Sequence, residues 1–184
     1  IDHILEPNGI KNMAIAGNFE KDRKKNEVKY YDYSVDNQQL SFTGSGKMVY
    51  KPYGADDIEM LGPAGGWLAN SVDLMRVLVL VDGYSRRYKD ILSKDLINKM
   101  VNGVGGINQP LGWRSTRGEH WWRTGTLSGT SALLTRDEKG YSWVIVANTT
   151  PRRGSFPGTS RWAIREGIKL VKSWPSHDLF EVSE

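Results

Sequence analysis

The sequence predicts one domain over 1–184 of the α+β class, in which a C-terminal helix covers an antiparallel sheet. Three observations predict this fold. The middle of the chain has helical periodicity, its last third has aromatic and β-branched runs separated by short glycine-containing turns, and a further amphipathic segment follows. A helix with one apolar stripe after such a meander must cover one face of the sheet. We therefore expect an irregular cover segment over 1–62, a helical region over 63–109, and the sheet with its closing helix over 110–174.

The irregular segment is predicted from weak periodicity. Residues 1–62 contain many Asn, Asp, Lys, Tyr and Gly residues, as in the runs 30–34 and 43–47. Long connections with little regular structure often act as functional loops or covers. We expect short strands here, packed through their aromatic side chains.

The first helix follows the paired glycines of the run 63–68. Asn70 suits an N-cap, and Asp73 adds negative charge near the positive end of the helix. Gly83 suits the end of the helix. The apolar positions at helical spacing are Leu74, Met75, Leu78 and Val81.

Two further helices are predicted in the same way. One covers Lys94 to Val101, with Ser93 as its cap and Gly103 beyond its end. The closing helix runs from about Ser160 to Ser173 and ends before Pro175. Its apolar face is formed by Ile164, Gly167, Ile168 and Val171.

The strands of the last third are rich in aromatic and β-branched residues, as sheet residues are. Short turns at 117–118 and 137–140 separate several of them. The predicted strands cover 111–115, 120–124, 131–135 and 141–148.

Composition narrows the range of functions. The chain lacks cysteine, so disulfides and thiolate chemistry are excluded. The three histidines lack metal-ligand spacing, and we expect no metal and no cofactor. No apolar run is long enough to span a bilayer. The chain opens with Ile1 rather than Met, so we expect a processed chain or a fragment whose targeting segment would be lost.

Three segments carry a family resemblance. The first is 5–12, with Leu5-Glu6-Pro7-Asn8-Gly9-Ile10, and the second is 63–74, with Pro63-Ala64-Gly65-Gly66-Trp67-Leu68. The third combines Leu111-Gly112-Trp113, Arg123-Thr124-Gly125-Thr126-Leu127-Ser128-Gly129 and the run 144–148. In this order, the segments resemble the C-terminal portion of serine β-lactamases and penicillin-binding proteins, in the class-C-like and esterase-like branch that includes D-alanyl-D-alanine carboxypeptidases. The resemblance implies a partial β-lactamase-like fold.

The resemblance also implies substrate-binding residues. In this family a Lys-Thr-Gly or His-Thr-Gly strand borders the cleft, and here Arg123, Thr124 and Gly125 take those positions, followed by Thr126. The backbone N–H of Thr126 would be one oxyanion donor. Arg123 departs from the family because an arginine stays charged and cannot shuttle protons, although it can bind a carboxylate with two hydrogen bonds. The alternative is a plain strand whose glycines serve only turns.

The nucleophile of the family is missing from this chain. No serine is followed three residues later by lysine, and the second motif, Tyr-x-Asn or Ser-x-Asn, is absent. We therefore expect the chain to be inactive alone. It would pair with the missing N-terminal part of the fold or with another copy, and the parent would act on a small peptide, a β-lactam or an ester. An extracytoplasmic location follows from the resemblance only.

Two other functions compete with this one. The seven tryptophans, including Trp113, Trp121 and Trp122, could form an aromatic platform for peptidoglycan or another glycan, in a non-catalytic binding module. The basic stretch 21–29, which precedes three tyrosines, could contact nucleic acid, but Asp22 and Glu27 interrupt it and we expect a solvated loop without a nucleic-acid partner.

Overall fold

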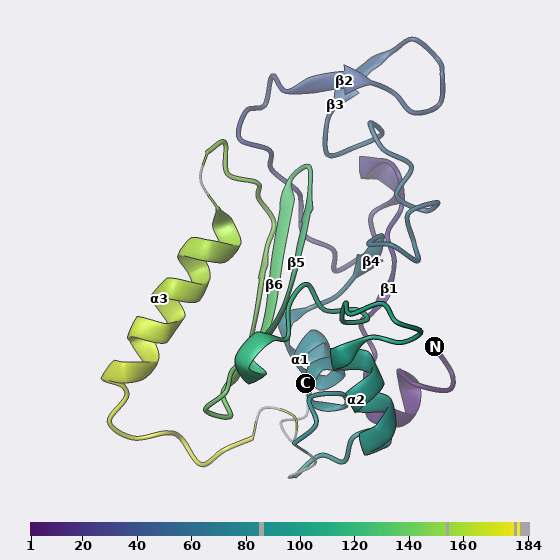
Figure 1. Ribbon diagram of the computed structural model, residues 1–184. Helices are drawn as coiled ribbons and strands as arrows, with labels where there is room; N and C mark the ends of the chain where they lie inside the picture. Colours follow the sequence, from purple (N-terminus) through teal and green to yellow (C-terminus); the bar gives the residue numbers. More distant parts are fainter. Residues whose placement is uncertain (85–86, 154, 179, 181–184) are drawn as a thin grey trace. The chain divides into compact units, whose positions relative to one another are not determined.

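The structure is a computed structural model that describes residues 1–84, 87–153, 155–178 and 180. It is α+β, as the sequence predicts (Figure 1). Its α-helices are α1 (Ser71–Val79), α2 (Lys94–Asn102) and α3 (Phe156–Leu170). Its strands are β1 (Ala14–Ile15), β2 (Gln38–Leu40), β3 (Met48–Tyr50), β4 (Trp67–Leu68), β5 (Trp121–Leu127), β6 (Thr130–Arg136) and β7 (Ser142–Ala147). Short 3-10 helices are η1 (Glu6–Asn8), η2 (Glu20–Asp22) and η3 (Arg117–Glu119).

The strands form small antiparallel sheets. Strand β1 pairs with β4, and β2 pairs with β3, with Leu40 opposite Met48. The largest sheet has the order β5-β6-β7, so consecutive strands are neighbours and both β5 and β7 are outer strands. This is the predicted meander.

The contacts of the chain group into two compact units. Unit 1 comprises 1–11, 70–124 and 133–145, and unit 2 comprises 12–69, 125–132 and 146–184. Each strand of the three-stranded sheet contributes residues to both units. The predicted division of one domain into the segments 1–62, 63–109 and 110–174 stays a prediction.

The core of unit 1 joins α1, α2 and the start of β5. Leu78, Ile97, Trp113 and Trp121 are buried together. The rings of Trp113 and Trp121 meet edge to face, with centroids 5.7 Å apart. Burying one such side chain contributes about 1.5–3 kcal/mol, so this cluster contributes several kcal/mol to the stability of unit 1.

The predicted caps of α1 and α2 are confirmed. Asn70 Oδ1 accepts the N–H of Asp73 at 2.7 Å, and Ser93 Oγ accepts the N–H of Leu96 at 3.3 Å. Helix α1 ends earlier than predicted, because Leu80 already caps it and the chain then turns through Gly83 at φ 77°.

Unit 2 is packed through tyrosines, as expected for its irregular part. The rings of Tyr30 and Tyr53 lie 5.9 Å apart, and Tyr53 Oη accepts the N–H of Tyr30 at 2.9 Å. Tyr31 forms a parallel bridge with Thr149 after β7. The hairpin β2–β3 keeps most of its residues exposed on both faces.

The predicted strand over 111–115 is wrong. The segment forms no strand, and its pairing is limited to an isolated bridge between Ser115 and Trp122. The N–H of Leu111 bonds to the carbonyl of Met100, and Gly112 has a left-handed φ of 76°. These features bend the chain and place Trp113 in the core. The segment therefore cannot extend into the alternating pattern of a strand.

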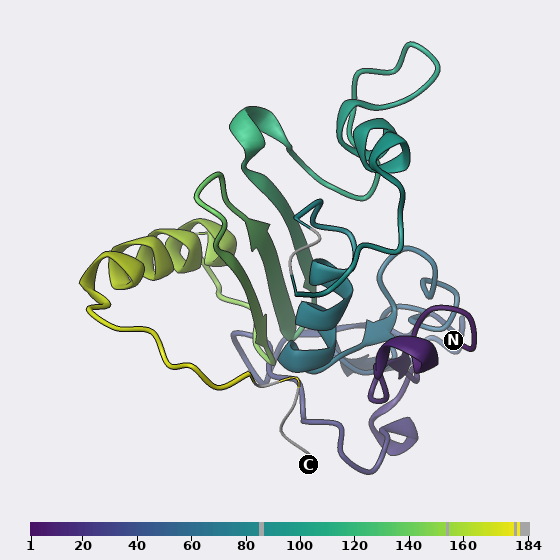
Figure 2. The same cartoon turned by 90° about the horizontal axis from the view of Figure 1, so that it is seen from below.

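Helix α3 lies over the three-stranded sheet, as predicted, but over a shifted range (Figures 1 and 2). It begins at Phe156 because Ser155 Oγ accepts the N–H of Gly158 and Pro157 suits the first turn. It ends at Leu170 because Val171 is extended. Ile164 and Ile168 are half-buried, whereas the predicted face residues Gly167 and Val171 are exposed.

Candidate cleft wall on strand β5

Strand β5 carries the four residues that the sequence analysis singled out. Arg123, Thr124, Gly125 and Thr126 are consecutive in this strand, and Arg123, Gly125 and Thr126 are exposed. The strand is anchored at its start by Trp121 in the core of unit 1. The predicted residues therefore lie on an accessible outer strand.

The direction of the Thr126 amide follows from pairing at Trp122. The N–H of Trp122 donates to the carbonyl of Ser115 at 3.1 Å, and its carbonyl accepts the N–H of Arg114 at 2.9 Å. Both groups thus point away from β6. Backbone groups alternate along a strand, so those of Thr124 and Thr126 also point toward the outer edge. This orientation is what an oxyanion donor on an exposed margin requires.

Gly125 occupies a position where the fold does not demand glycine. Its φ lies outside the left-handed region, and an added Cβ would meet only the Cβ of Ala132, at an ordinary 3.7 Å. A glycine inside a strand costs about 0.5–1 kcal/mol relative to alanine. A close approach of another backbone is a frequent reason for such a glycine. The alternative, that this glycine serves a turn, does not fit its place inside β5.

A buried arginine fixes the start of this strand. The guanidinium of Arg136 lies 4.2 Å from the ring centroid of Trp121 and 4.0 Å from that of Tyr84. Its Nε donates to the carbonyl of Asp82 at 3.1 Å, and its Nη1 donates to the carbonyl of Glu119 at 2.8 Å. Arg136 thereby ties the loop after α1 to the residues before β5.

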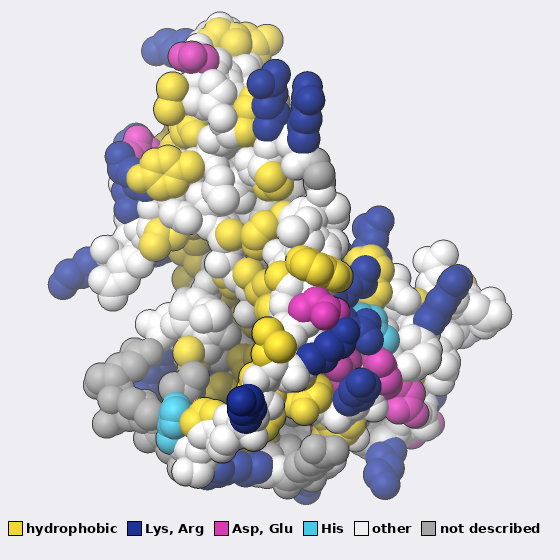
Figure 3. Space-filling view, turned by 90° about the vertical axis from the view of Figure 1, so that its left-hand side faces the viewer, with side chains coloured by type: hydrophobic (Ala, Val, Ile, Leu, Met, Phe, Trp, Pro, Cys, Tyr) yellow, Lys and Arg dark blue, Asp and Glu magenta, His cyan; other side chains and the backbone are white. Residues whose placement is uncertain are grey.

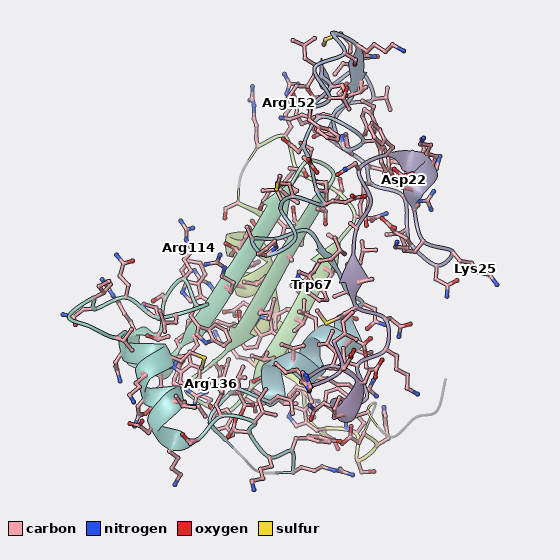
Figure 4. The ribbon with its side chains drawn as sticks, turned by 90° about the vertical axis from the view of Figure 1, so that its right-hand side faces the viewer. Asp22, Lys25, Trp67, Arg114, Arg136 and Arg152 are labelled. Atoms are coloured by element: carbon pink, nitrogen blue, oxygen red, sulfur yellow. The ribbon has the colours of Figure 1, made fainter. Side chains whose placement is uncertain are left out.

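A second guanidinium borders the outer edge. Arg114 pairs through its backbone with Trp122, and its guanidinium lies 5.9 Å from the Trp122 ring centroid. Figure 4 shows the side chain of Arg114 at the margin of the sheet, well separated from Arg136. With Arg123 exposed on β5 itself, the edge strand and its neighbour both carry positive charge.

The first two family-like segments have structural tasks. A Cβ on Gly66 would come within 3.0 Å of the backbone of Gly62 and still closer to the carbonyl oxygen of Ile58, so only glycine fits there. Arg76 Nη1 donates to the carbonyl of Gly9 at 2.8 Å and to the buried carboxylate of Asp73 at 3.1 Å. These bonds hold the first segment against α1.

The tryptophans proposed as a glycan platform are mostly inside. Trp113 and Trp121 are buried in the core of unit 1, and Trp122 is half-buried. Side chains that form the core cannot present an exposed platform. Trp113 and Trp121 are thus unsuited to a glycan platform, whereas Trp67, Trp162 and Trp174 are exposed.

The acidic residues Glu20 and Glu27 form contacts within and beside the basic stretch 21–29. Lys29 Nζ lies 2.6 Å from Glu20 Oε1, and this lysine lowers the pKa of the Glu20 carboxyl. Glu27 accepts hydrogen bonds from the Lys24 N–H and from the Tyr30 hydroxyl. Burial, followed by the bond to Glu27, raises the pKa of the Tyr30 phenol. These contacts give the stretch local structure, while the Lys24 side chain is exposed.

The described residues contain neither a metal-binding cluster nor a membrane-spanning helix. Among them, no group of three or more His, Asp or Glu side chains is placed to hold a metal ion. None of the helices in these ranges has the length and hydrophobicity to cross a bilayer.

Comparison with known proteins identifies no relative. No protein-family model, curated protein or solved structure matches the chain. The assignment of a function therefore depends on the residues and geometry described above.

Sequence reasoning missed Arg136, the residue that fixes the start of β5. In the sequence it stands beside the turn 137–140, where a charged residue is ordinarily exposed. Only the fold brings Tyr84 and Trp121 to either side of it. Its position directly after the predicted strand 131–135 gives no signal that it is buried.

Proposed function

We propose that the chain supplies the cleft wall and one oxyanion donor of a serine hydrolase that works through an acyl-enzyme, with the nucleophilic serine outside this chain. The proposal is supported by strand β5. There Gly125, which the fold does not require to be glycine, lies between Thr124 and Thr126, and the amides of both threonines point to the outer edge. The ordered family-like segments give the reaction class, which is acyl transfer from a peptide, β-lactam or ester.

The chemistry assigned to each residue follows from its placement. A substrate backbone would lie along the outer edge of β5 as an added strand, and Gly125 would leave room for it. The Thr126 N–H would donate to the oxygen that becomes negative as the tetrahedral intermediate forms. Exposed Arg123 would bind a substrate carboxylate with two parallel hydrogen bonds.

The proposal includes a partner for the chain. The serine and its activating lysine would come from further polypeptide, either the N-terminal part of the same fold or a second copy. We expect no covalent adduct when the chain alone is incubated with a fluorescent penicillin and examined by intact-protein mass spectrometry. An adduct on this chain would contradict the proposed division of roles.

The deciding experiment assays the full-length protein that carries this chain with nitrocefin and p-nitrophenyl acetate. Thr126→Pro removes the proposed donor, and proline is tolerated at outward-facing positions of an edge strand. We expect kcat to fall by about 10²–10³-fold. The matched control Thr126→Ala keeps the N–H and should retain most activity. Equal kcat values for the two variants would contradict an oxyanion role.

A second variant separates function from stability at Gly125. Gly125→Ala removes the cost of a glycine inside a strand, so the free energy of unfolding should rise by about 0.5–1 kcal/mol. The added methyl group would meet an incoming substrate, so kcat/KM should fall. Unchanged kcat/KM in a stabilised variant would show that no substrate backbone approaches here.

A further inference from the structure

The positive charge of the chain is concentrated in one segment. Residues 151–174 contain six of the 25 basic residues but only one of the 21 acidic residues. The remaining 160 residues carry 19 basic and 20 acidic side chains, so this segment accounts for the whole positive excess. The basic residues are Arg152, Arg153, Arg161, Arg165, Lys169 and Lys172, and the acidic one is Glu166.

The same segment exposes large apolar side chains. Trp162 is 66% exposed, Leu170 is 79% exposed, and Trp174 beyond the end of α3 is 55% exposed. Ile164 and Ile168, by contrast, are half-buried. Figure 3 views the molecule from the side of α3 and shows hydrophobic side chains interspersed with basic ones on this face.

Helix geometry places these residues on one side of α3. Trp162 and Leu170 are separated by eight residues, which is about 80° around the helix axis, and Lys169 falls beside Trp162. Ile164 and Ile168 fall on the other side. Glu166 lies within the exposed arc, but Lys169 Nζ is 2.6 Å from its Oε1 and neutralises it. Apart from this pair, Arg165 is exposed beside the stripe and Lys172 is exposed beyond the end of the helix, so apolar side chains and positive charge lie close together on α3.

We propose that the exposed stripe of α3 and the residues 171–174 dock onto an anionic lipid surface. Tryptophan and leucine insert at the level of the lipid headgroups, and lysines and arginines are attracted to anionic lipids. Nucleic acid would instead need a basic groove lined by aromatic residues. A single helix with tryptophan and leucine on its exposed side suits the flat surface of a lipid bilayer better than it suits a nucleic-acid strand. The proposal is independent of the acyl-transfer proposal, because it uses no residue of β5.

The test is sedimentation of the chain with phosphatidylcholine vesicles that either contain or lack phosphatidylglycerol. The chain should sediment with the anionic vesicles only, and the bound fraction should fall when salt is raised well above about 0.1 M. The double variant Trp162→Ala and Leu170→Ala should weaken binding by about tenfold or more. Lys172→Glu combined with Arg153→Glu should also weaken it.

Matched controls on another exposed surface make the result specific. Val35→Ala with Leu40→Ala truncates two exposed apolar side chains at and near β2, and Lys24→Glu with Lys25→Glu reverses two exposed charges elsewhere. Both control pairs should leave vesicle binding unchanged. Absence of sedimentation, an equal loss in the controls, or salt-sensitive binding of RNA or DNA without vesicle binding would each overturn the proposal. Circular dichroism checks that every variant is folded.

Discussion

At the residue scale, Gly129 shows how one turn of the sheet depends on the absence of a side chain. It lies in the β5–β6 turn with φ +78°, and a Cβ there would come within 2.8 Å of Tyr30 and 2.9 Å of Pro52. The left-handed backbone and the close approach both exclude other residues. This contrasts with Gly125, which the fold would allow to be alanine.

Gly129→Ala should therefore lower the free energy of unfolding by about 2–4 kcal/mol, through strained φ and overpacking together. Gly65→Ala is the matched control, because its Cβ would meet no atom within 4 Å. The control should change stability by less than about 0.5 kcal/mol. Urea unfolding followed by circular dichroism measures both. A Gly129 variant as stable as the control would show that Tyr30 and Pro52 can move away from the added methyl group without loss of stability.

The half-buried phenol of Tyr30 should make the free energy of unfolding depend on pH. Burial raises the pKa of its phenol above the ordinary value near 10. Below about pH 10 the phenol is protonated in both states, so the bond to Glu27 contributes fully. Above that pH the unfolded chain loses the proton more readily, and stability falls as pH rises.

Tyr30→Phe should make the loss of stability above about pH 10 less steep. Its effect is read from urea midpoints measured between about pH 8 and pH 11. Tyr33→Phe is the control, because the Tyr33 ring is exposed, and it should leave the slope unchanged. A slope identical in wild type and Tyr30→Phe would refute the role of Tyr30.

At the element scale, the sequence predicted those features that depend on local chemistry. The caps at Asn70 and Ser93 and the meander of β5, β6 and β7 were recognisable, because capping residues and turn glycines act within a few positions. The conformation of the segment 111–115 was not recognisable from the sequence, because the packing of Trp113 in the core outweighs the strand propensity of the segment.

The candidate site could be predicted only in part. The exposed residues of β5 were identified in advance, since Arg123–Thr126 matches a family-like motif. The outward direction of the Thr126 amide needs the bridge between Ser115 and Trp122, which periodicity does not reveal. The support from Arg136 needs contacts between residues about 50 positions apart.

Replacing buried Arg136 should destabilise unit 1 much more than replacing an exposed arginine. Arg136→Met removes the bonds to Asp82 and Glu119 and leaves two carbonyls without their donor. We expect the free energy of unfolding to fall by about 2–4 kcal/mol. Arg117→Met, at an exposed arginine of η3, should change it by less than about 0.5 kcal/mol. Equal urea midpoints for the two variants would contradict this role of Arg136.

At the scale of the whole molecule, the chain exposes much apolar surface. Within the described residues, eleven hydrophobic residues are buried and twenty large ones are exposed, among them the cross-strand pair Leu40 and Met48. Exposed apolar patches of this kind mark interaction surfaces or a tendency to associate. The surface is consistent with the proposed need for further polypeptide.

We expect the isolated chain to self-associate with rising concentration. Sedimentation velocity over a range of protein concentrations should show a growing average mass, and Leu40→Lys with Met48→Lys should reduce it, because like charges would face each other across the hairpin. A mass that stays at 20.7 kDa across the range would contradict the expectation.

The crowding around Gly66 bears on how this chain could have diverged. Since any side chain there would collide with the backbone near Ile58 and Gly62, selection for folding alone suffices to keep the glycine. A descendant without the proposed chemistry would keep Gly66 for as long as it folds. The fold does not require Gly125, so its replacement in related sequences would mark lineages without the proposed substrate contact.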